Sequence, residues 1–344
     1  MKLVGGRSGR RVALGLVGLG IIVATFAYFL PTIADYRDVW AVVSDLSWQW
    51  VAVLTAATVL NLVTFAPPWM VALPGLSFVQ AMVVTQTSTA LSIVVPAGLA
   101  AGMASSYGML RTWGFASRDV ARAVTLTGLW NQFLNLSFPI VAVFLLSTTG
   151  GDSRVLSLAA FVGTAVLGVV VAGLVVVLAS KRLAEDIGDL AARLANRALG
   201  KVRRGPVSWG GQAFERFRRE AGELLRRRWL ALTAVSLAGS LTVFLVLVLS
   251  LRALDVPASQ VTVVEAFAAW SLVRLLGTIP ITPGGIGIIE LGLTGALIGF
   301  GGDNTAVVAA VLVYRFLTMV PTLVVGLLAA TTWRRHRRAV EVAP

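Results

Sequence analysis

Long apolar runs, separated by short polar or basic segments, recur from one end of the chain to the other. A helix needs about 20 consecutive apolar residues to cross the hydrocarbon core of a bilayer. Runs of that length predict about six full spans, at residues 12–30, 50–73, 121–146, 154–179, 229–251 and 305–332. The pattern indicates an all-α, polytopic integral membrane protein with a single membrane domain over residues 1–344.

Two further apolar segments, residues 79–114 and 262–301, are interrupted near their middle. The interruptions are Pro96 to Gly98 in the first segment and Pro280 to Gly285 in the second. Proline lacks a backbone donor and glycine weakens a helix, so each segment is expected to form two short helices joined by irregular backbone. The alternative interpretation is a pair of ordinary short helical hairpins.

The basic residues predict the orientation of the chain. Thirteen of the 29 Lys and Arg residues lie in the loop at 180–228, and further groups flank the first and last spans. Lys and Arg accumulate on the cytoplasmic side of membrane proteins. We therefore expect a multi-pass protein of the cytoplasmic (inner) membrane with this loop and both termini in the cytoplasm.

The net charge of +13 would suggest a nucleic-acid partner in a soluble protein, but the composition is 57% hydrophobic and only 13% charged. Topology explains the basic residues better, so no nucleic acid is expected to bind. The loop 180–228 contains two amphipathic stretches, which are expected to lie on anionic headgroups at the cytoplasmic face. A topology determinant without a lipid role is the alternative, and a homo-oligomer remains open.

With this orientation, residues 79–114 must enter and leave the membrane from the cytoplasm, and residues 262–301 from outside. The chain would then contain two re-entrant helix pairs inside two units of opposite orientation, 50–146 and 229–332. Inverted repeats with discontinuous helices are common in transporters, where the substrate site lies near the bilayer midplane.

Charged residues in apolar context mark the second broken segment. An ionised side chain costs roughly 2.5 to 3.5 kcal/mol at the centre of a spanning helix. Arg274 and Glu290 flank the break, Arg315 lies in the next span, and Glu265 precedes them. These groups are expected to face one another or a wet cavity, and a structural salt bridge is the alternative.

The break itself could form an anion site. If a half-helix begins at Ile286, the free N–H groups of Gly284 to Gly287 would present the positive end of a helix dipole to a phosphate. Glu290 could receive a headgroup amine, receive a proton, or balance the arginines, and these three roles stay open. The predicted substrate-binding residues are Arg274, Pro283, Gly284, Gly285, Gly287, Glu290 and Arg315, together with the amides Asn131 and Gln132 in the span 121–146.

Catalytic signals are weak. The lone histidine, His336, lies in the basic C-terminal tail, and cysteine is absent. A Ser/His/Asp triad or a His-based metal cluster inside the membrane is therefore excluded, and we predict no cofactor and no metal site.

The string from Ile281 to Glu290, followed by Arg315 and by Pro321 to Gly326, resembles the lysylphosphatidylglycerol synthase transmembrane-domain family, also called flippase-like proteins. The tract from Pro96 to Arg111 is similar to the family's first broken segment. Many members carry Gly-Glu there, whereas Met103 follows the glycine in this chain.

The resemblance implies movement of a lipid between leaflets, and aminoacylated phosphatidylglycerol is the best known cargo. We expect a lipid transporter, not an enzyme, acting on an anionic or aminoacylated phospholipid or on a polyprenyl-phosphate-linked lipid. The alternative is a membrane-embedded enzyme or accessory subunit that acts on lipid-linked substrates.

Overall fold

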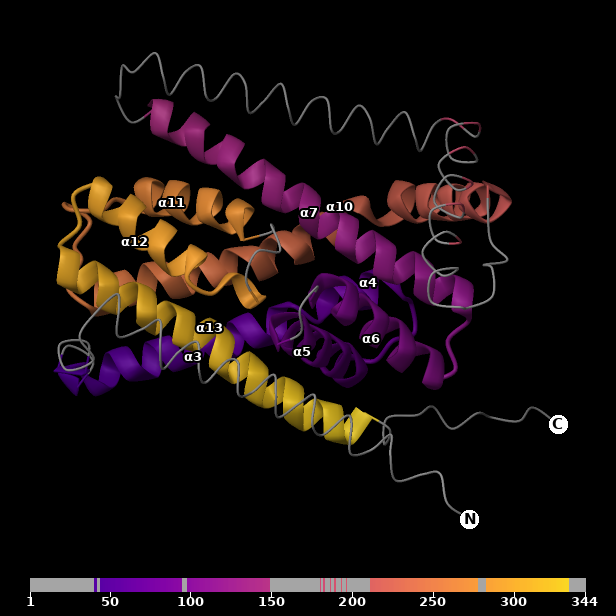
Figure 1. The fold of residues 1–344 in the computed structure, drawn as a ribbon, viewed down its shortest axis with the longest axis horizontal. Coiled ribbons are helices and arrows are strands. Elements are labelled where there is room, and N and C mark those ends of the chain that lie inside the picture. The colour runs from indigo at the N-terminus through magenta and orange to yellow at the C-terminus, as the bar shows by residue number, and fades with distance from the viewer. Residues whose placement is uncertain are drawn as a thin grey trace.

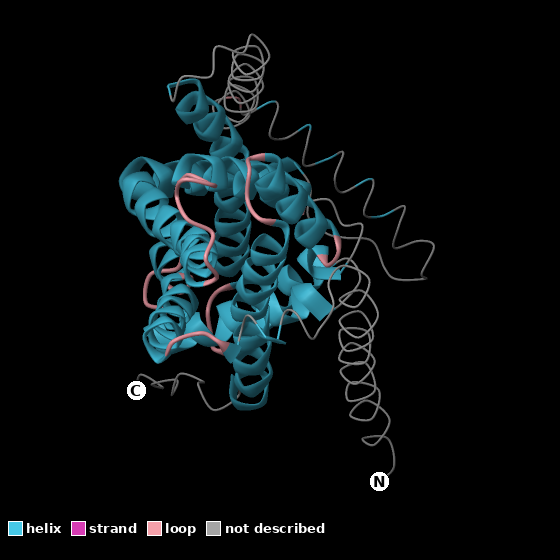
Figure 2. Ribbon diagram, turned by 90° about the vertical axis from the view of Figure 1, so that its left-hand side faces the viewer, coloured by secondary structure: helices cyan, strands magenta, loops and turns pink. Residues whose placement is uncertain are grey.

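The computed structural model describes residues 40–41, 44–94, 98–148, 211–277 and 283–333, and a few single residues between 180 and 196. All regular structure in these residues is helical (Figure 2). The helices are α3 (Trp48–Thr64), α4 (Pro67–Ala72), α5 (Phe78–Val94), α6 (Gly98–Thr112), α7 (Ser117–Thr148), α10 (Gly211–Ala253), α11 (Val263–Leu276), the 3-10 turn η1 (Pro283–Gly285), α12 (Ile288–Gly299) and α13 (Asn304–Thr332).

Four helical stretches of the described residues are long and apolar enough to cross a membrane: Trp48–Ala72, Ser117–Ser147, Arg226–Ala253 and Asn304–Thr332. They coincide with four of the predicted spans. Large apolar side chains on these stretches, including Phe144, Leu230 and Leu328, are exposed, as expected for surfaces that face lipid. The chain is a multi-pass membrane protein. The predicted spans 12–30 and 154–179 and most of the loop 180–228 lie outside the described residues.

The predicted span 50–73 is two helices, because α3 ends at Thr64 and α4 begins at Pro67. Proline cannot donate to the preceding turn and is favoured at the first position of a helix. Two polar side chains of α5 bond to carbonyls near this joint. Thr85 Oγ1 donates to the carbonyl of Phe65 at 3.3 Å, and Gln86 Nε2 donates to the carbonyl of Leu62 at 3.0 Å.

Both interrupted segments form the expected helix pairs, α5 with α6 and α11 with α12. In the first pair the helices approach closely through small residues. A Cβ atom added to Gly98 would lie 1.8 Å from the carbonyl oxygen of Ser92, and one added to Gly102 would lie 2.1 Å from the Ser92 Oγ. The absence of side chains at these two glycines therefore allows α5 and α6 to pack closely.

Each broken segment packs against a span of the other half of the chain. Helix α5 packs on α13, α11 packs on α7, and the first helices of the two halves, α3 and α10, also pack together. In Figure 1 the orange pair α11 and α12 lies to the left and the violet pair α5 and α6 lies further right, with α13 running past both. An aromatic cluster of Phe138, Phe244, Phe267 and Trp270 joins α7, α10 and α11.

Candidate functional site

A cavity of about 490 Å³ lies between the two halves and is lined by residues of both broken segments. Its wall is rich in hydroxyl and amide side chains, although it is built from apolar helices. The polar lining residues are Asn61, Thr85, Gln86, Ser88, Thr89, Ser92, Ser106, Thr127, Asn131, Asn135, Ser236, Arg274, Tyr314, Arg315, Thr318 and Thr322. Because polar groups are expensive in hydrocarbon, such a lining suits water or a polar ligand.

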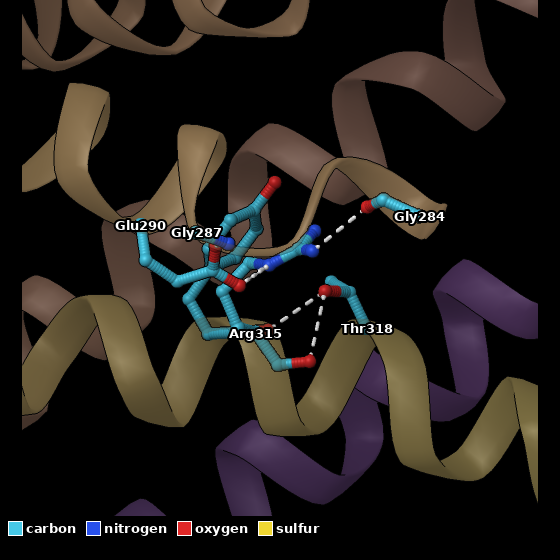
Figure 3. A network of polar contacts seen from close by, with 6 residues as sticks. Gly284, Gly287, Glu290, Arg315 and Thr318 are labelled. Atoms are coloured by element: carbon cyan, nitrogen blue, oxygen red, sulfur yellow. Dashed lines mark hydrogen bonds and ion pairs between the residues drawn. The ribbon is translucent and has the colours of Figure 1, made fainter. Parts of the chain in front are cut away.

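Arg315 and Glu290 form a buried ion pair between α13 and α12. The Nε of Arg315 lies 2.6 Å from Glu290 Oε1, and both side chains are less than a tenth exposed. An Arg315 terminal nitrogen donates to the carbonyl of Gly284 at 3.0 Å, so the guanidinium also holds the η1 turn (Figure 3). Thr318 lies one turn further along α13 and donates to the Tyr314 carbonyl at 2.8 Å.

The half-helix begins at Ile288, not at Ile286 as the sequence pattern suggested. Gly284, Gly285 and Gly287 have φ angles of 63°, 67° and 84°, a region in which glycine is unstrained. These angles continue the turn past Ile286 and delay the start of the helix.

The N–H of Gly287 is occupied by the protein itself. It donates to Glu290 Oε2 at 2.7 Å, so the other carboxylate oxygen of the ion pair caps α12. Within the turn from Gly284 to Gly287, only Gly284 lines the cavity. The Gly287 amide is therefore not free for a phosphate, and Glu290 supplies the negative charge at this helix end. An anion site formed by the remaining amides of the turn stays a prediction.

Glu265 belongs to a different feature from the other predicted intramembrane charges. It sits in the first turn of α11, where its carboxylate accepts from the N–H of Thr262 at 2.8 Å. The Thr262 hydroxyl accepts from the N–H of Glu265 in return, which completes a capping box. Its role is to cap a helix, and it does not line the cavity.

Arg274 also lines the cavity, but it has quite different partners. Its Nε donates to Asn135 Oδ1 at 2.7 Å, and its guanidinium carbon lies 5.1 Å from the centroid of the Trp270 ring. The Asn135 amide nitrogen donates to Gln132 Oε1 at 3.0 Å, which orients Asn135. Among the described residues, no carboxylate lies within ion-pair distance of Arg274.

The structure therefore divides the predicted site residues. Arg274, Asn131, Gly284 and Arg315 line one cavity, while Gly285, Gly287 and Glu290 lie behind it and shape the break. Gln132 accepts a hydrogen bond from the amide nitrogen of Asn135, and Asn135 lines the cavity. The side chain of Pro283 is outside the described part.

Sequence reasoning did not select two cavity residues, Trp270 and Tyr314. Asn135 follows Asn131 by four positions, so both amides share one face of α7, and both line the cavity. No sequence pattern pointed to Trp270 or Tyr314, because aromatic residues are common in apolar spans.

A family model described as the lysylphosphatidylglycerol synthase TM region matches residues 15–326 of the chain. The match covers the cavity, both broken segments and the span that carries Arg315. No curated protein matches the chain in a sequence comparison.

Proposed function

Because the chain belongs to the lysylphosphatidylglycerol synthase transmembrane-region family, we propose that it moves a lipid with a phosphate-containing headgroup between the leaflets of the cytoplasmic membrane. The observation that carries this proposal is the polar cavity between the two broken segments. The lipid is a phospholipid or a polyprenyl-phosphate-linked lipid, and transport requires no catalytic step.

The dimensions of the cavity suit a headgroup. Its volume of about 490 Å³ falls within the range of small-ligand pockets, roughly 300 to 1,000 Å³. Its hydroxyl and amide lining would replace the water that a headgroup loses on entering the membrane. The acyl or polyprenyl chains would stay in the surrounding hydrocarbon, where their transfer requires no polar partners.

The contacts between the two halves suggest how the cavity would open to alternate sides. The reciprocal packing of α5 on α13 and of α11 on α7 supports the proposed inverted repeat of 50–146 and 229–332. In transporters of that plan, one repeat rocks against the other around a fixed central site. The basic loop 180–228 and both termini would face the cytoplasm in this arrangement.

The contacts of Glu290 favour transport over catalysis. This carboxylate is paired with Arg315 and also accepts from the Gly287 N–H, so both of its oxygens are engaged. A general acid or base must instead reach the reacting group of a substrate. Glu290 therefore supports the shape of the cavity and is not placed for proton transfer to a ligand.

The test is reconstitution of the purified protein into liposomes that contain a headgroup-labelled fluorescent phospholipid and, in parallel, a labelled polyprenyl-phosphate sugar. A membrane-impermeant quencher removes the signal of the outer leaflet only. The expected result is additional quenching in proteoliposomes as inner-leaflet lipid moves outward. Protein-free liposomes give the baseline, and quenching at that baseline for every lipid would overturn the proposal.

A further inference from the structure

The charged side chains of the described cavity wall are all positive. Among the described lining residues the charged side chains are Arg274 and Arg315, and no Asp or Glu is present. Residues 95–97 and 278–282 at the two breaks contain no acid either. The apolar segments contain two acidic residues: Glu265, which caps α11 and does not line the cavity, and Glu290, which is 4% exposed and paired with Arg315. The ion pair neutralises Arg315, so Arg274 carries the one uncompensated charge among the described residues of the wall.

Several N–H donors of Arg274 have no hydrogen-bond acceptor among the described residues. A guanidinium has five N–H donors in a planar fork, and in the described part of the chain only the Nε donor of Arg274 has a hydrogen-bond partner, Asn135. The terminal nitrogens can therefore donate two parallel hydrogen bonds to a phosphate. Trp270 and Asn135 fix the plane of the guanidinium, which makes it a pre-oriented anion ligand.

The remaining wall offers hydrogen-bond acceptors. The hydroxyls of Ser88, Ser92, Ser106, Thr127 and Thr318 each donate to a backbone carbonyl of their own helix. A hydroxyl that donates in this way keeps its oxygen lone pairs for an incoming donor. These oxygens would accept from the O–H groups of a ligand.

Gln86 provides a further hydrogen-bond acceptor, one that has no partner among the described residues. Its side chain is 3% exposed, and its amide nitrogen is committed to the carbonyl of Leu62. Its oxygen, Oε1, is buried without a donor among the described residues, although Gln86 lines the cavity. An unsatisfied buried acceptor is unfavourable, and a ligand hydroxyl that reaches Oε1 would satisfy it.

We infer that the cavity selects a phosphate that bears an uncharged polyol, such as glycerol or a sugar, and disfavours a headgroup that carries an ammonium group. The inference rests on the proposed function and narrows its cargo. The phosphate neutralises Arg274, and the polyol donates to the hydroxyl and amide oxygens. An aminoacyl group would bring a positive charge into a wall that has an uncompensated arginine and no free carboxylate, where a buried unpaired charge is strongly unfavourable.

The deciding experiment compares three lipids that carry the same fluorophore on the hydrophobic chain, namely phosphatidylglycerol, lysyl-phosphatidylglycerol and a polyprenyl-phosphate hexose. Their transport is measured in proteoliposomes, and their binding to the detergent-purified protein is measured by native mass spectrometry. At least one uncharged-polyol lipid should bind and move about tenfold better, or more, than the lysyl lipid, because only the lysyl lipid brings an unpaired ammonium group into the wall. The polyol lipid that is preferred identifies the phospholipid or the polyprenyl source.

The outcomes separate the two proposals. Equal or better binding and transport of the lysyl lipid would overturn the cargo inference and leave the transporter proposal standing. Transport of none of the three would overturn the transporter proposal, and the binding order would then decide the cargo inference alone.

Variants of the wall give a second, independent measurement. Arg274→Gln should lower binding of the polyol lipid about tenfold or more, because a charged hydrogen bond contributes about 1.5 to 3 kcal/mol. Asn131→Asp adds a carboxylate to the wall without removing a partner of Arg274, and should shift the binding preference toward the lysyl lipid. Arg219→Gln, which removes an exposed arginine of α10, is the matched control. An unchanged preference in Asn131→Asp with normal thermal stability would contradict the inference.

Discussion

Arg315 and Glu290 are 25 positions apart in the chain, and their side chains meet at 2.6 Å in the interior of the helix bundle. The pair joins a continuous span, α13, to the start of the half-helix α12. Through Gly284 and Gly287 it also holds both ends of the glycine turn between the two parts of the broken segment. One ion pair thus fixes the part of the cavity wall formed by the glycine turn and α13.

The first prediction concerns the stability of this pair. Glu290→Gln leaves the guanidinium of Arg315 buried without a counter-charge, and removal of one partner of a buried ion pair typically lowers the free energy of unfolding by about 3 to 5 kcal/mol. We expect a large drop in thermal stability in detergent. Arg315→Lys should also destabilise, because a lysine cannot bridge Glu290 and the Gly284 carbonyl with a planar fork.

The control for this pair is the double variant Glu290→Leu with Arg315→Met. Apolar replacement of both partners removes the unpaired charge, so the double variant should be more stable than either Glu290→Leu or Arg315→Met alone. Wild-type stability of Glu290→Gln together with lost transport would show instead that Glu290 serves a headgroup or a proton.

The second prediction concerns the glycine turn. Gly285 has a φ angle of 67°, and an added Cβ would lie 2.7 Å from Ile289 Cδ1. Gly285→Ala should therefore lower the free energy of unfolding by about 1 to 2 kcal/mol from the left-handed backbone alone. Gly295→Ala is the matched control, since Gly295 is an exposed residue within α12 and an added Cβ there meets no atom within 4 Å. Equal thermal stability of the two variants would argue against the described turn.

Local chemistry made the broken segments predictable. Proline and glycine act on the backbone at their own positions, so the tracts from Pro96 to Gly98 and from Pro280 to Gly285 were sufficient to place both interruptions. The same reasoning would have divided the span 50–73 at Pro67, which follows the joint between α3 and α4, but the apolar length of the run concealed it. The family resemblance, carried by the string from Ile281 to Glu290, is confirmed by the match to residues 15–326.

Side-chain pairing was predictable only in part. The energetic argument that buried charges need partners led correctly to Glu290 near Arg315. It could not decide which of the two arginines would pair with Glu290. The contact that engages Arg274 instead is with Asn135, which is 139 positions away, and it depends on how α11 packs against α7. That single contact distinguishes the arginine of the ion pair from the arginine that we propose to bind a ligand.

The third prediction concerns topology. The chain contains no cysteine, so single cysteines can be introduced without background labelling. Arg118→Cys at the start of α7 and Ser259→Cys between α10 and α11 are both exposed and lie on opposite sides in the predicted orientation. An impermeant thiol reagent should label Ser259→Cys in intact cells and Arg118→Cys only after permeabilisation. Labelling of both from outside would refute the orientation.

The last prediction tests whether the cavity is the route of transport. Gly128 of α7 lines the cavity, and an added Cβ there meets no atom within 4 Å. The side chain of Gly128→Phe would extend into open space, so this variant should block the cavity with little effect on thermal unfolding. Gly108→Phe is its control, because Gly108 also has no atom within 4 Å of an added Cβ but is not among the residues of the cavity wall. Lipid transport in proteoliposomes should be lost in the first variant and kept in the second, since only the first obstructs the polar path. Equal transport by both, at wild-type stability, would place the route elsewhere on the protein.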